Sequence, residues 1–188
     1  MPLYINIIRD PVEHFISNYY YLRHGFERNQ QKLTAYQKSR WSHSNVISTD
    51  ERDQNLTTYI AQNPKIYSDM IPYFCGNDPW CRRRDERALS QAKHNLLHSF
   101  IAVGVLEEFE ESLELFEMIL PQFFKGIIWL YKRHNEELQE KSKTANKVEE
   151  TGLVKTFLRE RLKPEIELYE FAKKTMKFRL DSLRKDRS

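Results

Sequence analysis

The chain has 188 residues, of which 40% are hydrophobic and 13% aromatic, enough to build the core of one domain. The aromatic content argues against intrinsic disorder, and the lack of any run of about 18 apolar residues argues against a membrane-spanning helix within this sequence. A net charge of +3 is compatible with a polyanionic partner but does not require one.

The first stretch predicts a strand that turns directly into a helix. Tyr4–Ile8 is rich in β-branched and aromatic residues, which is typical of a strand. Asp10 is a favourable N-cap residue, Pro11 suits the first helical position, and Glu13 completes an Asp-x-x-Glu capping pattern. A helix is therefore expected over residues 10–23.

Arg9 and Ser17 are the candidate binding residues of this stretch. Arg9 lies at the tip of the strand, and Ser17 follows about two helical turns later. A helix N-terminus offers partial positive charge and free N–H groups, and a guanidinium beside it can bind a phosphate through two parallel hydrogen bonds. The alternative, which spacing alone favours, is an ordinary capped helix with a surface arginine.

Residues 26–54 are polar and lack periodicity, so a long loop is expected there. Asn55 then opens an Asn-Leu-Thr sequence, which is an acceptor for N-glycosylation if Asn55 is exposed in a luminal protein.

Cys75 and Cys81 are the only cysteines. The residues between them, 76–79, are turn formers, so the two cysteines could close a tight loop as a disulfide. Two free thiols remain an alternative. Half of a zinc site is another, since His94 and His98 follow nearby at i, i+4 spacing.

The second half of the chain is expected to be mainly helical. Its glutamates between 107 and 120 should form a solvated outer face. Two strands that are each followed by a helix predict an α/β protein with a parallel sheet. The expected elements are a helix over 86–99, a buried strand over 100–105, an amphipathic helix over 107–120 and a long amphipathic helix over 152–182 that breaks near Pro164.

Three blocks of the sequence, in order, resemble one enzyme family. A strand, then Arg-Asp-Pro, then a serine eight residues after the arginine is similar to the 3′-phosphate-binding element of Golgi carbohydrate sulfotransferases. The longer stretches of sequence around this element resemble the uronyl 2-O-sulfotransferases, which include the heparan sulfate and dermatan/chondroitin enzymes and the insect Pipe proteins. The blocks are Ile7–Val12 with Phe15–Tyr19, Ile71–Gly76 with Cys81, Ala88–Leu89 and Gln91–Asn95, and Val103–Glu110 with Leu120–Gly126.

The resemblance implies a partial P-loop-type sulfotransferase fold, with residues 1–188 as the C-terminal part of a single domain. It implies transfer of a sulfuryl group from 3′-phosphoadenosine 5′-phosphosulfate (PAPS) to the 2-hydroxyl of a uronic acid in a glycosaminoglycan, without a metal. Arg9 and Ser17 would hold the 3′-phosphate. Tyr131, Thr144 and Lys147 would contact the nucleotide; a flexible lysine-rich loop is the alternative for residues 143–147. The family's 5′-phosphosulfate-binding loop and catalytic base are expected to be missing from this sequence, so no catalytic residue is assigned.

In the family, the region that corresponds to residues 26–54 helps to hold the sugar chain, so Lys32 and Arg40 are candidates to contact it; a solvated loop with scattered charges is the alternative. Asn18, beside Ser17, is a further candidate to face the acceptor sugar. The resemblance also favours a disulfide between Cys75 and Cys81. It places the protein in the Golgi lumen, with a type II membrane anchor only in a full-length form. Homo-oligomers are an open option, and no nucleic-acid partner is expected. The alternative is a catalytically incomplete fragment that only binds nucleotide or glycosaminoglycan.

Overall fold

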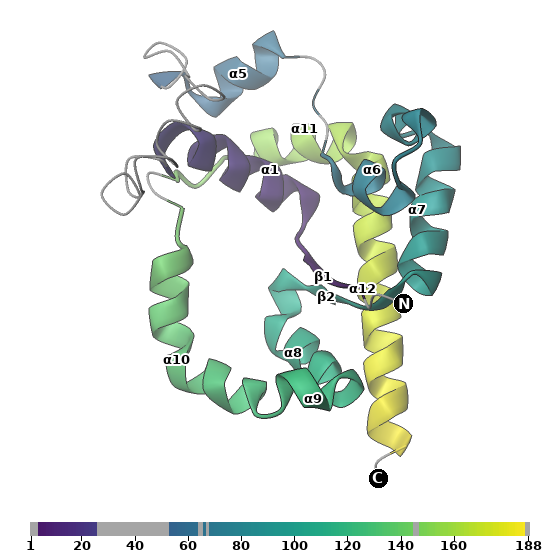
Figure 1. The fold of residues 1–188 in the computed structure, drawn as a ribbon. Helices are drawn as coiled ribbons and strands as arrows, with labels where there is room; N and C mark the ends of the chain where they lie inside the picture. Colours follow the sequence, from purple (N-terminus) through teal and green to yellow (C-terminus); the bar gives the residue numbers. More distant parts are fainter. Residues whose placement is uncertain (1–3, 26–52, 64–65, 67, 145–146, 187–188) are drawn as a thin grey trace, which may run out of the picture.

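The structure is a computed structural model, which describes residues 4–25, 53–63, 66, 68–144 and 147–186. These residues are mostly helical and surround a small parallel sheet, as Figure 1 shows, which confirms the α/β class. The strands are β1 (Tyr4–Ile8) and β2 (Phe100–Val105). The helices are α1 (Pro11–Tyr20) with its π-helical extension η1 (Tyr21–Gly25), α5 (Leu56–Gln62), α6 (Met70–Cys75), α7 (Glu86–His98), α8 (Phe109–Ile119), α9 (Pro121–Phe124), α10 (Ile127–Ser142), α11 (Gly152–Arg161) and α12 (Lys163–Asp186), and two short 3-10 turns are η3 (Pro79–Arg83) and η4 (Leu106–Glu108).

The two strands run parallel, and their register pairs Ile8 with Val105. Both strands therefore end at the same edge of the sheet, which brings the residues after β1 next to those after β2. β2 is buried from Ala102 onward, whereas β1 exposes Ile5 and Ile7. β2 is thus the strand on which the core is built.

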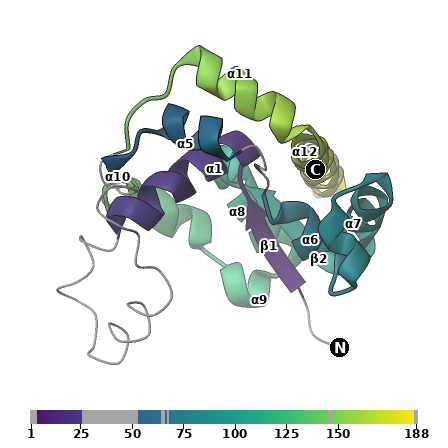
Figure 2. The ribbon, with the colours of Figure 1, turned by 90° about the horizontal axis from the view of Figure 1, so that it is seen from above.

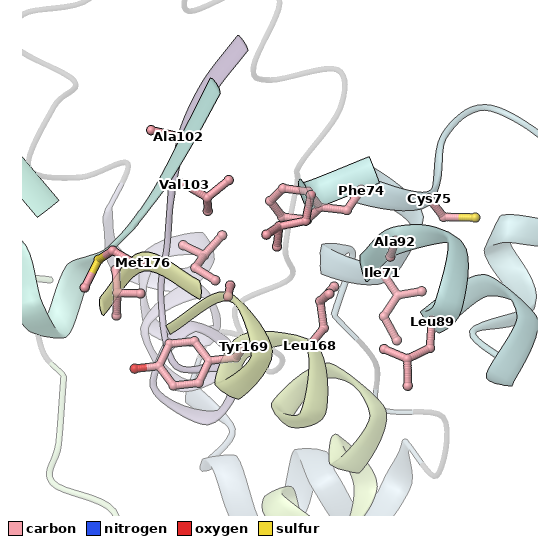
Figure 3. Close-up of a cluster of buried hydrophobic side chains, with 14 of the residues drawn as sticks. Ile71, Phe74, Cys75, Leu89, Ala92, Ala102, Val103, Leu168, Tyr169 and Met176 are labelled. Carbon is pink, nitrogen blue, oxygen red and sulfur yellow. The ribbon is translucent and has the colours of Figure 1, made fainter. Parts of the chain in front are cut away.

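The larger core packs around β2, on α6, α7, α8 and α12. α12 is the longest of the described helices, with 24 residues, and it packs against β2, whose direction it crosses (Figure 1 and Figure 2). Its buried residues recur every three or four positions, so one face of the helix meets the core. Figure 3 shows the side chains that meet there: Ile71 and Phe74 of α6, Leu89 and Ala92 of α7, Ala102 and Val103 of β2, and Leu168, Tyr169 and Met176 of α12.

A close approach at Gly104 fastens β2 to α8. A Cβ atom at Gly104 would lie only 2.7 Å from the Cβ of Ser112, so a glycine is required for this contact. The buried Ser112 Oγ accepts a hydrogen bond from the Val105 N–H (2.7 Å) and lies 2.9 Å from the carbonyl oxygens of Val105 and Glu108. The end of β2 is therefore held in a defined position.

A second, smaller core joins α1, α5 and α11. Figure 2 shows α11 running alongside α1 and α5. Because this cluster anchors α1, it sets the position of the helix that follows β1. Its fully or nearly buried members include Val12 and Ile16 of α1, Leu56 and Ile60 of α5, and Val154 and Leu158 of α11.

The expected helices over 10–23 and 86–99 are confirmed by α1 with η1 and by α7. The break near Pro164 is also confirmed, because α11 ends at Arg161 and α12 begins at Lys163. One expectation was wrong: the long helix over 152–182 is expected to carry Phe178 on its apolar side, but this residue is 77% exposed. Residues 70–75, for which the sequence predicted no particular element, form helix α6.

The acidic outer face expected for residues 107–120 was also wrong in part. The Glu108 carboxylate lies 3.0 Å from Lys173 Nζ and 2.9 Å from Lys177 Nζ, and Glu114 forms a bidentate pair with Arg184. The basic residues of α12 thus face Glu108 of η4 and Glu114 of α8. The paired residues lie more than 60 positions apart in sequence, so no local signal reveals the pairing.

Cys75 and Cys81 form a disulfide, as the resemblance implied. It closes the turn between α6 and α7, with Cα atoms 5.6 Å apart. Asn95 of α7 reinforces this turn by donating its side-chain amide to the carbonyls of Phe74 and Cys75, both at 2.9 Å. The zinc and free-thiol alternatives are therefore not realised.

Reduction of this disulfide should lower the free energy of unfolding by about 2 kcal/mol, because the loop that it closes is short. Urea unfolding of oxidised chain, and of reduced and alkylated chain, measures the difference. The double variant Cys75→Ala/Cys81→Ala is the matched control, since its stability should not respond to reductant. Alkylation of both cysteines in non-reduced, luminally expressed protein would contradict the disulfide.

Glu165, at the start of α12, is 2% exposed, and its Oε1 has no hydrogen-bond partner among the described residues. Arg84 Nε is 3.7 Å away. Burial raises the pKa of the Glu165 carboxyl, and neither backbone hydrogen bonds nor the Arg84 charge fully offsets this. The carboxylate form is therefore disfavoured in the folded chain.

A raised pKa in the folded state gives stability that is present at low pH and is lost as pH rises through that pKa. The variant Glu165→Gln carries no such group, so its stability relative to wild type should increase between pH 4 and pH 7. Urea unfolding of both proteins across this range tests the sign. If the stability of the glutamine variant relative to wild type fell as pH rises, the result would show instead that the ion pair with Arg84 stabilises the fold.

Candidate functional site

A cavity of about 890 Å³ lies beside the carboxyl edge of the sheet. Its wall is formed by parts of α1, the turn after β2, the inner side of α10 and residues 143–144, 147–150 and 155. These segments surround one side of the strands in Figure 1. The parallel register explains this location, because the residues that follow both strands meet at that edge.

The residues expected to contact a nucleotide all line this cavity: Arg9, Ser17, Tyr131, Thr144 and Lys147. They come from three separate parts of the chain, and tertiary structure brings two of them into direct contact. Ser17 Oγ and Thr144 Oγ1 are 2.8 Å apart, within hydrogen-bond distance, although 127 positions separate them. Their common location is a structural finding, whereas their role as ligands of a nucleotide stays a prediction.

The N-terminus of α1 is capped, and this corrects the expectation of free N–H groups there. Asp10 Oδ1 accepts hydrogen bonds from the N–H groups of Val12 (2.9 Å) and Glu13 (3.0 Å). The N-cap side chain therefore takes the donors that an anion would have used. Any anion in this cavity depends mainly on side-chain donors.

Glu13 does not complete the expected capping box. The Asp10 N–H donates instead to Glu107 Oε1 at 3.0 Å. The Glu13 carboxylate turns to two lysines: its Oε2 lies 3.0 Å from Lys147 Nζ, and its Oε1 lies 3.0 Å from Lys155 Nζ. This side chain belongs to the cavity wall rather than to the cap.

In the ion triad of Glu13, Lys147 and Lys155, the two lysines favour the charged form of the carboxylate. Partial burial opposes ionisation of Glu13, but hydrogen bonds from Lys155 and Lys147 outweigh it and hold the pKa of this carboxyl below its usual range. The same hydrogen bond raises the pKa of Lys155. Each group thus favours the charged form of its neighbour.

Part of the cavity wall is apolar and aromatic. The rings of Phe109 and Tyr131 meet edge to face with centroids 5.0 Å apart. Leu106, Leu138 and Val148 line the cavity as well. A cavity with a cationic, hydroxyl-rich part and an aromatic part suits an anionic ligand that carries a planar apolar group.

Not every expected residue reaches the cavity. Asn18 is exposed and does not line it, while Lys32 and Arg40 lie outside the described residues. Asn55 is exposed at the N-cap of α5, where its side chain accepts a hydrogen bond from the Thr58 N–H (2.8 Å). An exposed position is what a glycosylation site requires.

Sequence reasoning missed Glu13 and Lys155 as cavity residues. Glu13 fitted a capping pattern, and Lys155 resembles any solvated lysine of an amphipathic helix. No local signal distinguishes them, because their contacts are made between residues more than 130 positions apart.

In the described part of the chain, no three His, Cys, Asp or Glu side chains gather closely enough to form a candidate metal site. None of the helices described here combines the length and apolar character needed to cross a membrane.

The sequence of the chain is similar to those of known sulfotransferases. No protein-family model matches the chain. The chain is 37% identical over 179 residues to the uronyl 2-sulfotransferases of Homo sapiens and Mus musculus, which covers 92% of the chain and 42% of each relative. It is 33% identical over 178 residues to heparan sulfate 2-O-sulfotransferase 1 of Gallus gallus, which covers 94% of the chain and 48% of that protein. The chain spans slightly less than half the length of these curated relatives, and it belongs to the uronyl 2-O-sulfotransferase family.

Proposed function

We propose that the chain is part of a PAPS-dependent glycosaminoglycan 2-O-sulfotransferase and that its cavity binds the 3′-phosphoadenosine portion of the donor. The observation that carries this proposal is the meeting of Arg9, Ser17, Tyr131, Thr144 and Lys147 around one cavity. The donor would supply the sulfuryl group, and the acceptor would be the 2-hydroxyl of a uronic acid. The names of the relatives support this class of acceptor.

The donor set of the cavity fits a phosphate. A phosphate group accepts hydrogen bonds and carries about −1.5 to −2 charges at neutral pH. Arg9 can offer a guanidinium fork, Lys147 an ammonium group, and Ser17 a hydroxyl already paired with that of Thr144. The aromatic wall of Phe109 and Tyr131 gives the base a surface on which to pack.

The wider assignments follow from this proposal. The whole domain would have the P-loop-type sulfotransferase fold, with Asn18, Lys32 and Arg40 near the sugar chain. The disulfide supports an oxidising compartment such as the Golgi lumen, since disulfides persist there and are rare in the cytosol. The exposed Asn55 of the Asn-Leu-Thr sequence is compatible with glycosylation in the same compartment.

The first test is the variant Arg9→Ala, with binding measured by calorimetry. Wild type should bind adenosine 3′,5′-bisphosphate more tightly than adenosine 5′-monophosphate. Arg9→Ala should weaken bisphosphate binding about 10- to 100-fold, as expected for the loss of charged hydrogen bonds worth roughly 1.5–3 kcal/mol. Binding of the monophosphate should change little, because it lacks the 3′-phosphate.

Arg83→Ala is the matched control, since Arg83 is exposed and does not line the cavity. An Arg9→Ala variant with the affinity of wild type would contradict the assignment of this arginine.

The second test concerns the acceptor. PAPS with a labelled sulfuryl group should label glycosaminoglycans that carry free uronic acid 2-hydroxyls, and disaccharide analysis should place the label at that position. Chains whose uronic acid 2-hydroxyls are already sulfated are the matched control and should stay unlabelled. Binding of the bisphosphate without any transfer would instead favour a nucleotide- or glycosaminoglycan-binding fragment.

A further inference from the structure

Three of the cationic side chains that line the cavity come from three different segments. Arg9 follows β1, Lys147 precedes α11, and Lys155 lies within α11. The two lysines are held by one carboxylate, that of Glu13, with one lysine on each oxygen at 3.0 Å. Lys147 and Lys155 therefore make equivalent contacts with Glu13, one with each carboxylate oxygen.

The charges that line the cavity do not balance. Four cationic side chains line the cavity (Arg9, Lys143, Lys147 and Lys155) against three carboxylates (Glu13, Glu149 and Glu150), which leaves a surplus of one positive charge among the described lining residues. Glu150, which also lines the cavity, accepts a hydrogen bond from the Tyr20 hydroxyl at 2.6 Å. A phosphate monoester, at about −1.5 to −2 charges, has the sign of charge that this surplus attracts.

Lys155 can bind a ligand without leaving Glu13. An ammonium group carries three donors, and the Glu13 Oε1 contact uses one direction. The Lys155 side chain is only 36% exposed, so a ligand in the cavity would replace part of its remaining hydration. The hydrogen bond that Lys155 donates to the Glu13 carboxylate also raises the pKa of Lys155, which favours the charged amine.

We infer that Lys155 of α11 is a further phosphate-binding residue, which joins Arg9 and Lys147 around the 3′-phosphate of the donor. This inference rests on the proposed function. Glu13 is the counter-charge that holds both lysines at the cavity wall. α11 thereby contributes to ligand binding as well as to the smaller core.

The experiment compares two variants that break the same ion pair. Lys155→Met removes a phosphate donor, and it should weaken binding of adenosine 3′,5′-bisphosphate about tenfold or more while adenosine 5′-monophosphate changes by less than about twofold. Glu13→Gln keeps an amide oxygen as an acceptor for a lysine and removes a negative charge from beside the phosphate, so it should lower bisphosphate affinity less than Lys155→Met does. Lys155→Arg should keep most of the affinity, because it keeps the charge.

Lys174→Met is the matched control, since Lys174 is an exposed lysine of α12 that does not line the cavity. Equal losses of bisphosphate affinity in Lys155→Met and Glu13→Gln would overturn the inference, because they would mean that the lysine only bridges α1 and α11. The inference would also be overturned if Lys155→Met still preferred the bisphosphate over the monophosphate as wild type does, while Arg9→Ala lost this preference. The proposed function would stand in that case. A wild type that binds both nucleotides equally would overturn the proposed function and this inference together.

Discussion

The arrangement of the site depends on the carboxylate of Glu107, which links three segments of the chain through hydrogen bonds. Its Oε1 accepts a hydrogen bond from the Asp10 N–H, and its Oε2 accepts one from the Tyr169 hydroxyl, both at 3.0 Å. It therefore ties the turn after β1 and the turn after β2 to α12. Arg9 Nε lies 3.9 Å from the same Oε1, so this carboxylate also directs the guanidinium at the cavity wall.

This link can exist only because the strands are parallel and in register. Ile8 pairs with Val105, so the chain leaves the sheet at Arg9 and at Leu106 along one edge. The hydrogen bonds of Ser112 and the contact at Gly104 hold the end of β2 against α8. One side of the cavity is thus built on the most buried part of the molecule.

The other side of the cavity is less buried. α10 has no buried residue and contributes Tyr131 to the wall, whereas α11 is anchored through Val154 and Leu158. The polar contacts between the sides are those of Ser17 with Thr144 and of Glu13 with its two lysines. Such partly exposed ion pairs add little stability, so their value lies in positioning donors.

Acidic residues illustrate what local pattern cannot show. On a helical projection, Glu108 and Glu114 fall on the outer face of an amphipathic segment and read as solvated. In the structure, their partners are lysines and an arginine of α12. Charge alone does not reveal a partner that lies 60 or more residues away, because the pairing depends on which helices pack together.

The sequence by itself determined the local elements and the family. Strand β1, the Asp10 cap, the break before Pro164 and the tight cysteine loop all follow from residue types within a few positions, where backbone preferences act. The motif blocks also pointed to Arg9, Ser17, Tyr131, Thr144 and Lys147. Only the tertiary structure decided that these five share one cavity, that Glu13 turns from the cap to two lysines, and that Lys155 joins them. Those contacts join segments whose distance in space is set by packing of the cores, and packing is a property of the whole chain rather than of any stretch of it.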